Sequence, residues 1–150
     1  MIIREFKKED IRKVLTIENA SFDEPFSESL FKTFFAKFRR GFRIAESGGR
    51  LIGYSIIFPH QRSDSMILMS IAIDPNYRRR KLGLALLRDA ITLATNLGAK
   101  RLILQVAKDN LPARNLYTKV GFKETQDLQN YYGKKRDGVE MELLTGQNGV

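Results

Sequence analysis

The sequence lacks cysteine and tryptophan, has a single histidine, and contains no long apolar run. The absence of cysteine excludes disulfides, zinc–thiolate sites and thiol nucleophiles. Because His60 is the only histidine, a metal site built from several histidines is excluded as well, and we expect no metal centre. No apolar stretch is long enough to span a bilayer, and the first five residues do not resemble a secretory signal. We therefore expect a cytoplasmic protein with no membrane partner.

Basic residues outnumber acidic ones by 26 to 17, which gives a formal net charge of +9. Such a charge indicates an anionic partner, whether nucleic acid, an acidic surface or a phosphorylated cofactor, but it is also typical of an ordinary solvated surface. A chain of 150 residues is long enough to form one domain with a sizeable core. Since no repeat or linker is visible, we expect a single domain over residues 1–150 with a frayed tail after about Leu144.

Apolar periodicity and turn residues predict a strand, two helices, three strands, a helix, a strand, a helix and two strands. Ser27 is expected to cap the second helix, and Gly41 to end it. The expected strands cover 2–6, 42–47, 51–58, 66–73, 101–107, 122–128 and 139–144, and the helices 8–20, 28–39, 82–97 and 111–120. The aromatic cluster between Phe22 and Phe42 is interpreted first as hydrophobic core. This order predicts a layered α/β domain.

The stretch from Ser70 to Leu87 reads as a buried strand, a basic turn and the beginning of a helix. Such a turn can hold phosphates, because the first amides of the helix are free and the helix dipole favours negative charge there. The turn contains four consecutive basic residues, Arg78, Arg79, Arg80 and Lys81, whose side chains would add charge-assisted hydrogen bonds. A solvated arginine-rich turn is the alternative.

A second segment, from Asn110 to Phe122, resembles the Asn-x-x-Ala-x-x-Leu-Tyr-x-Lys-x-Gly-Phe pattern of the GNAT acetyltransferase superfamily. Near the end of the chain, Tyr131 and Tyr132, with Asp137 and Met141, are similar to the last part of RimI-type and archaeal or eukaryotic N-terminal α-amino acetyltransferases. The resemblance covers nearly the whole chain. It implies the GNAT fold, with a mixed, mostly antiparallel sheet of about seven strands and four helices on both faces.

The basic turn departs from the family's coenzyme loop, which usually reads Arg/Gln-x-x-Gly-x-Gly/Ala. One register begins at Arg78 and places Lys81 where the first glycine belongs. The other begins at Arg80 and places Gly83 there; the spacing from Gly83 to Gly98 favours the first register. A lysine in this position is expected to be tolerated only at negative φ, and Lys81 would then add a phosphate contact.

The resemblance implies acetyl-CoA as co-substrate, lying between two diverging strands at 71–74 and 105–108. The backbone N–H of Ile73 would polarise the thioester carbonyl, as an oxyanion hole does. Asn110 would bind the pantetheine arm, cap its helix, or do both. The implied cofactor-binding residues are Ile71, Ala72, Ile73, Arg78, Arg79, Arg80, Lys81, Leu82, Gly83, Leu84, Ala85, Asn110 and Tyr117.

The implied reaction is direct attack of an amine on the thioester, with one proton leaving the amine and another reaching the thiolate. Tyr117 matches the family's general acid, and a phenol with a pKa of about 10 suits that role; packing in the core is the alternative. RimI-type enzymes have a glutamate base where this chain has Gln105, which accepts no proton. Glu24 matches a glutamate that contacts the substrate and aids deprotonation through water, although it could equally solvate a loop. A strong base is not required, because an α-amino group has a pKa of about 8.

Tyr131 and Tyr132 would close over the backbone of a substrate peptide, and Phe22 and Phe26 would line the pocket for its first side chain. For the tyrosines, packing against a strand is the alternative. The leading hypothesis is therefore an enzyme that acetylates the α-amino group of protein or peptide N-termini, with the ribosome as a candidate platform.

Three alternatives remain at this point. A related enzyme would acetylate lysine side chains or a small amine. A nucleic-acid-binding module is suggested by the charge, but no known binding motif is present, so nucleic acid is not expected as a partner. A non-catalytic acetyl-CoA sensor is permitted by Gln105. The oligomeric state is left open.

Overall fold

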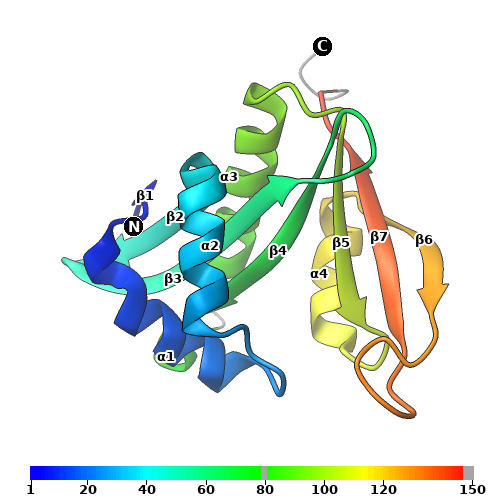
Figure 1. Ribbon diagram of the computed structural model, residues 1–150, viewed down its shortest axis with the longest axis horizontal. Coiled ribbons are helices and arrows are strands. Elements are labelled where there is room, and N and C mark those ends of the chain that lie inside the picture. The colour runs from blue at the N-terminus through cyan, green and yellow to red at the C-terminus, as the bar shows by residue number, and fades with distance from the viewer. Residues whose placement is uncertain (79–80, 147–150) are drawn as a thin grey trace. The chain divides into compact units, whose positions relative to one another are not determined.

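Figure 1 shows the computed structural model, which describes residues 1–78 and 81–146. Its strands are β1 (Ile2–Glu5), β2 (Phe42–Ser47), β3 (Arg50–Pro59), β4 (Ser65–Ile73), β5 (Arg101–Ala107), β6 (Lys123–Leu128) and β7 (Gly138–Leu144). Its helices are α1 (Ile11–Ser21), α2 (Glu28–Phe38), α3 (Leu82–Asn96) and α4 (Leu111–Val120), with 3-10 turns at Lys8–Asp10, Arg39–Gly41 and Pro75–Tyr77. Among the described residues, no helix is both long and apolar enough to cross a membrane.

The strands form one seven-stranded sheet in the order β1-β2-β3-β4-β5-β7-β6. β4 and β5 are parallel, whereas β1 with β2, β2 with β3, β5 with β7 and β6 with β7 are antiparallel. This confirms the predicted α/β class and the mostly antiparallel sheet with its four helices. The chain folds into two compact units, one of Met1–Phe58 and Met69–Leu93, the other of Pro59–Leu68 and the chain from Ala94 onward.

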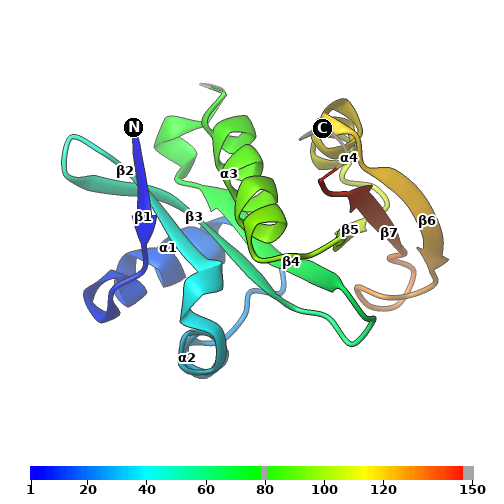
Figure 2. The same cartoon turned by 90° about the horizontal axis from the view of Figure 1, so that it is seen from above.

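In the first unit, helices cover both faces of the sheet (Figure 2). α1 and α2 bury Val14, Ile17, Phe31 and Phe34 against one face, and α3 packs Leu86 against the other. Each strand supplies side chains to both faces of the sheet, because successive side chains along a strand point in opposite directions. The core interpretation of the aromatic cluster is therefore confirmed for Phe31, Phe34 and Phe42, which are buried, but not for Phe22, which is exposed.

The bounds of α2 agree with the prediction to within one residue, but the role predicted for Gly41 is wrong. Ser27 accepts a hydrogen bond from the Leu30 amide at 3.1 Å, as expected of an N-cap. The helix ends at Phe38, and Gly41 lies in the following 3-10 turn at the entry to β2. A Cβ at Gly41 would lie 2.0 Å from the carbonyl oxygen of Ile57, so this glycine allows a close approach to β3 instead of ending a helix.

The second unit is built around β5. The first half of β4 pairs with it from Ser65↔Arg101 to Leu68↔Leu104, and β7 pairs along its whole length from Arg101↔Leu144 to Ala107↔Gly138. The predicted fraying after Leu144 is wrong for Thr145, whose amide donates to the Lys100 carbonyl at 2.9 Å and whose hydroxyl donates to the Ala99 carbonyl. The last four residues of the predicted tail, 147–150, lie outside the described part of the chain.

Candidate active site

In the first unit, the strand that precedes the basic turn is held firmly at its end. The Asp74 amide donates to the Ile52 carbonyl at 2.7 Å, and the Asp74 carboxylate accepts from the Asn76 amide at 2.9 Å. The same carboxylate is 2.9 Å from the Lys13 ammonium, whose hydrogen bond lowers the pKa of Asp74. The exit of β4, with the predicted cofactor-binding residues Ile71, Ala72 and Ile73, is therefore rigidly placed.

Arg78 ties the turn to the end of α1. Its Nε donates to the Ile73 carbonyl at 3.1 Å, and one terminal nitrogen donates to the Ser21 hydroxyl at 2.9 Å. This arrangement joins the predicted coenzyme turn to the start of the loop that carries Glu24. Two other predicted phosphate ligands, Arg79 and Arg80, lie outside the described residues.

Lys81 contradicts one expectation. Its φ is +59°, in the left-handed region, and not negative as predicted for a lysine in a glycine position. Its carbonyl accepts from the Ala85 amide at 3.2 Å, so Lys81 stands immediately before α3. Gly83, by contrast, lies inside α3, and a Cβ there would lie 3.9 Å from the side chain of Ile73, in ordinary van der Waals contact. The register that puts Lys81 in the glycine position therefore fits the backbone.

The turn fits a phosphate group. The side chain of Lys81 is exposed, and α3 begins directly after it. The first residues of a helix have amides without an intrahelical partner, and these favour anions. Four of the predicted cofactor-binding residues form this first turn: Leu82, Gly83, Leu84 and Ala85.

The loop between α1 and α2 contains the three residues predicted to meet the substrate in this unit. Phe22 is 38% exposed and Glu24 is exposed. Phe26 is half-buried, with its ring 5.8 Å from that of Phe34. Phe26 therefore serves the core as well as the loop, while Phe22 and Glu24 face solvent.

A buried glutamate that sequence reasoning did not select holds this loop. Glu18, in α1, is only 2% exposed. Its carboxylate accepts from the Ser70 hydroxyl at 2.8 Å, from the Phe26 amide at 2.9 Å and from the Tyr54 hydroxyl. The available sequence signal was its spacing with Ile11 and Val14, which puts a carboxylate on the apolar face of a helix.

In the second unit, Tyr117 lies on the buried side of α4. Its ring is 5.7 Å from that of Phe122, and burial raises its pKa to about 12. Among the described residues, its hydroxyl has no hydrogen-bond partner. Asn110 accepts from the Ala113 amide at 3.3 Å and so caps α4, which confirms one of its two predicted roles.

Tyr131 and Tyr132 lie in the loop between β6 and β7. Their rings are 5.0 Å apart and nearly perpendicular, and Gly138 makes room for them because a Cβ there would lie 2.9 Å from the Tyr132 ring. Burial, Tyr131 and Tyr117 together raise the pKa of Tyr132 to about 12. Tyr132 and Tyr117 are therefore close enough to interact electrostatically.

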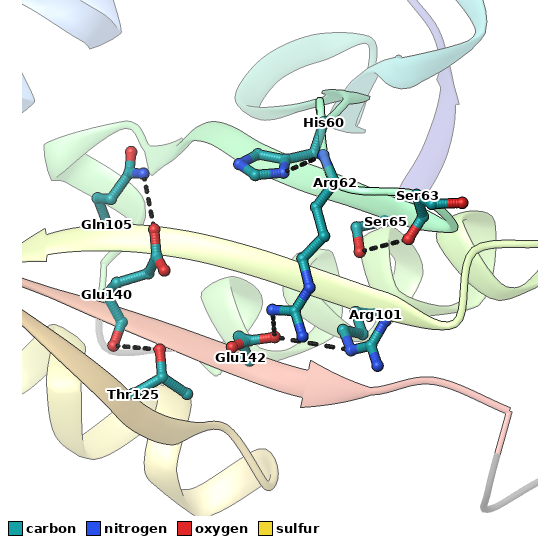
Figure 3. A network of polar contacts seen from close by, with 9 residues as sticks. All are labelled: His60, Arg62, Ser63, Ser65, Arg101, Gln105, Thr125, Glu140 and Glu142. Atoms are coloured by element: carbon teal, nitrogen blue, oxygen red, sulfur yellow. Dashed lines mark hydrogen bonds and ion pairs between the residues drawn. The ribbon is translucent and has the colours of Figure 1, made fainter.

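Gln105 is hydrogen-bonded on both sides. Its Nε2 donates to the Glu140 carboxylate at 3.2 Å, and its Oε1 accepts from the Tyr131 hydroxyl at 3.0 Å. Figure 3 shows Gln105 and Glu140 on adjacent strands, with Glu142 further along β7 beside Arg62 and Arg101. Sequence reasoning did not select Glu140.

His60, to which the sequence analysis gave no role, accepts a hydrogen bond from the Arg62 amide through Nδ1 at 3.0 Å.

Each unit thus carries one part of the predicted site. The first holds the coenzyme turn together with the α1–α2 loop, joined through Arg78 and Ser21. The second holds Tyr117, the tyrosine pair and the bonded pair Gln105–Glu140.

Comparison with known proteins gives consistent matches. The acetyltransferase (GNAT) family model matches residues 11–122. A Bacillus subtilis protein, named provisionally as an alanine N-acetyltransferase of ribosomal protein bS18, is 34% identical over 131 residues, which cover 87% of this chain and 85% of that protein. An N-alpha-acetyltransferase of Sulfurisphaera tokodaii is 28% identical over 152 residues, covering 93% and 90%. Among solved structures, Ard1 from Thermoplasma volcanium has a TM-score of 0.90 at 26% identity, covering 96% of this chain and 97% of that one.

Proposed function

Because the chain belongs to the acetyltransferase (GNAT) family, we propose that it transfers the acetyl group of acetyl-CoA to the α-amino group of protein N-termini. Family membership makes it an acyltransferase with acetyl-CoA as its co-substrate, as the sequence resemblance implied. The choice of an α-amino acceptor is supported by the two relatives named as alanine N-acetyltransferase and N-alpha-acetyltransferase.

We propose that both units form a single acetyltransferase domain, since the family match runs from the first unit into the second. Its partners are protein N-termini, which emerge at ribosomes, and the reaction then takes place in the cytoplasm. The ribosomal-protein substrate in the name of the Bacillus subtilis relative supports this setting.

Acetyl-CoA is expected to bind through the coenzyme turn. Lys81, Arg78, Arg79 and Arg80 would neutralise its phosphates, and the free amides at the start of α3 would donate hydrogen bonds. The exposed ammonium of Lys81 directly before the helix supports this assignment. The exit of β4 would contact the acetyl group, with the Ile73 amide on the thioester carbonyl and Asn110 on the pantetheine arm.

The amine nitrogen attacks the thioester carbonyl carbon, so that a C–N bond forms and the C–S bond breaks. Tyr117 is assigned to the departing sulfur. Its pKa of about 12 keeps the phenol protonated at all physiological pH values. Because an ordinary thiol has a pKa of about 8.5, complete proton transfer from this phenol is uphill, and we assign Tyr117 mainly the donation of a hydrogen bond to the developing thiolate.

The observation that carries the choice of a peptide substrate is the tyrosine pair beside Tyr117. Tyr132 interacts electrostatically with Tyr117, and Tyr131 exposes half of its surface. Phenol hydroxyls both donate and accept hydrogen bonds, which suits an extended peptide backbone. We assign contacts with the first residue of that peptide to Phe22, Phe26 and Glu24. Glu24 would also aid deprotonation of the α-amino group through a water molecule.

A peptide panel tests this function. Peptides with one internal lysine, differing in their first residue, are offered with free or blocked N-termini together with acetyl-CoA. We expect acetylation only of free α-amino groups, located by fragmentation mass spectrometry. Acetylation confined to the internal lysine would contradict the proposal and favour a lysine acetyltransferase.

A further inference from the structure

We propose that Glu140 is the proton acceptor of this site and that Gln105 holds its carboxylate in position across the β5–β7 pair. This inference rests on the proposed acetylation of an amine and adds the group that removes the proton. The observation behind it is the bonded series from the Tyr131 hydroxyl through the Gln105 amide to the Glu140 carboxylate.

The chemistry requires such a group. An α-amino group with a pKa of about 8 is mostly an ammonium ion at about pH 7, and the ammonium has no lone pair with which to attack. One N–H bond must break, and the proton must reach an acceptor before or during C–N bond formation. The amide of Gln105 does not accept it, whereas the Glu140 carboxylate becomes a carboxylic acid and later returns the proton to water.

The geometry fixes which end of Gln105 faces Glu140. The two residues are directly opposite in the antiparallel register, so their side chains share one face of the sheet. A carboxylate only accepts hydrogen bonds, so the amide NH2 must point to it and the amide oxygen to Tyr131. Gln105 thereby joins Glu140 to Tyr131, one of the proposed peptide-binding residues.

The other carboxylate on this face is already neutralised. Glu142 lies two residues further along β7, with its Oε1 2.8 Å from Arg62 and 3.9 Å from Arg101. Glu140, in contrast, forms no ion pair with any described residue. The neighbours that face Glu140 are Gln105 from β5, Gln126 opposite it on β6, Tyr131 from the loop and Glu142 along β7. The cation that β6 puts on this face, Lys123, stands opposite Glu142 and not opposite Glu140.

The half-buried position also suits the role. Gln105 and Glu140 are both partly exposed, so the carboxylate remains accessible to water while one oxygen is held. Its second oxygen has no hydrogen bond from the described part of the chain. A carboxylate that is fixed at one oxygen and open at the other can receive a proton directly or through one water.

Three variants test the proposal: E140Q, the double variant Q105E/E140Q, and E142Q as the matched control. kcat/KM is measured on the amine that the wild-type protein acetylates, from about pH 6 to about pH 10. At about pH 7, the kcat/KM of E140Q is expected to be at least about tenfold lower than that of the wild type, a loss that general-base catalysis can account for. The loss should shrink above about pH 8, where the α-amino group is neutral without help. Affinity for acetyl-CoA should stay unchanged.

The double variant exchanges the amide and the carboxylate, so it retains the cross-strand hydrogen bond and should recover most of the lost activity. A merely structural role could also be rescued by the retained hydrogen bond, but it would not make the loss shrink as the pH rises. E142Q should keep the wild-type pH profile, and thermal melting checks that all variants fold. An E140Q profile parallel to that of the wild type would overturn the role of Glu140. If the wild type acetylates only lysine side chains, the proposed α-amino substrate is wrong. The same variants, assayed on the lysine amine, would then test the role of Glu140 independently.

Discussion

The hydroxyl of Tyr54, in β3, donates a hydrogen bond to the buried carboxylate of Glu18, in α1. The interaction links the helix before the α1–α2 loop to the middle of the sheet. The carboxylate also accepts from Ser70 and from the Phe26 amide. Burial, followed by the nearby Glu18 charge, raises the pKa of Tyr54 far above its usual value, so the phenol stays a donor.

Replacing Glu18 with alanine should therefore destabilise the protein and loosen the loop. It leaves a part-buried amide and two buried hydroxyls without their acceptor, and we expect a loss of about 2–4 kcal/mol in the free energy of unfolding. Urea unfolding measures that loss. Because the Phe26 amide is released, the peptide KM should rise, while acetyl-CoA affinity should change little.

Two other variants make this prediction specific. E18Q can turn its amide so that the oxygen faces Phe26 and the NH2 faces the two hydroxyls, and it should cost much less than E18A. Ser55 is the control, because its buried hydroxyl lacks a partner among the described residues and S55A should be nearly neutral. Equal destabilisation by E18A and E18Q would mean that the charge, and not the hydrogen bonds, matters.

The left-handed Lys81 gives a second prediction. K81G removes both the strain at φ +59° and the ammonium, whereas K81A removes only the ammonium. Release of strain and the extra freedom of glycine in the unfolded chain, each about 1 kcal/mol, should nearly cancel. K81G is thus expected to be about as stable as K81A. If the ammonium binds phosphate, both variants should bind acetyl-CoA several-fold more weakly in calorimetry; unchanged affinity would remove Lys81 from the coenzyme site.

Most of the elements could be predicted from the sequence because their local signals agree. β2 and β5 have the predicted bounds, and the Ser27 and Asn110 caps are present. Gly41 was misinterpreted because a helix-ending glycine and a glycine that admits a neighbouring strand look the same in a sequence. For Lys81, side-chain propensity argued against the backbone conformation that the turn in fact adopts.

The parts of the site that were missed depend on contacts between distant residues. Glu140 faces Gln105 only because β7 pairs with β5 in one register, and a shift of one residue would put Glu140 on the opposite face. The role of Glu18 likewise requires Tyr54 and Ser70, which lie 36 and 52 residues away in the chain.

Tyr117 provides a third prediction. Y117F keeps the ring that packs against Phe122 but removes the hydroxyl assigned to the leaving sulfur. We expect kcat to fall by about 10–100-fold, which is typical of removing a hydrogen bond that strengthens in the transition state. Acetyl-CoA affinity and thermal stability should be nearly unchanged. Steady-state kinetics with equilibrium binding separates these quantities, and an unaltered kcat would leave Tyr117 only its packing role.

Alkaline pH should destabilise the protein through ionisation of Tyr117 and Tyr132. The pKa of Tyr117 and that of Tyr132 are each raised to about 12, first of all by burial. In the unfolded chain, tyrosines ionise at about pH 10, whereas the folded chain keeps these two protonated at that pH. Their contribution to stability is therefore complete below about pH 10 and is lost as the pH rises through about 12.

Urea unfolding at a series of alkaline pH values measures this loss. Y117F removes one of the two titrating groups, so its free energy of unfolding should fall less steeply with pH than that of the wild type. Y131F is the matched comparison: the Tyr131 ring is half-exposed, and burial comes before Tyr131 among the causes that raise the pKa of Tyr132, so Y131F should change the slope less than Y117F does. If the wild type and Y117F lose stability in parallel, the burial of Tyr117 does not govern the alkaline transition, and other tyrosines, Tyr54 foremost, are responsible.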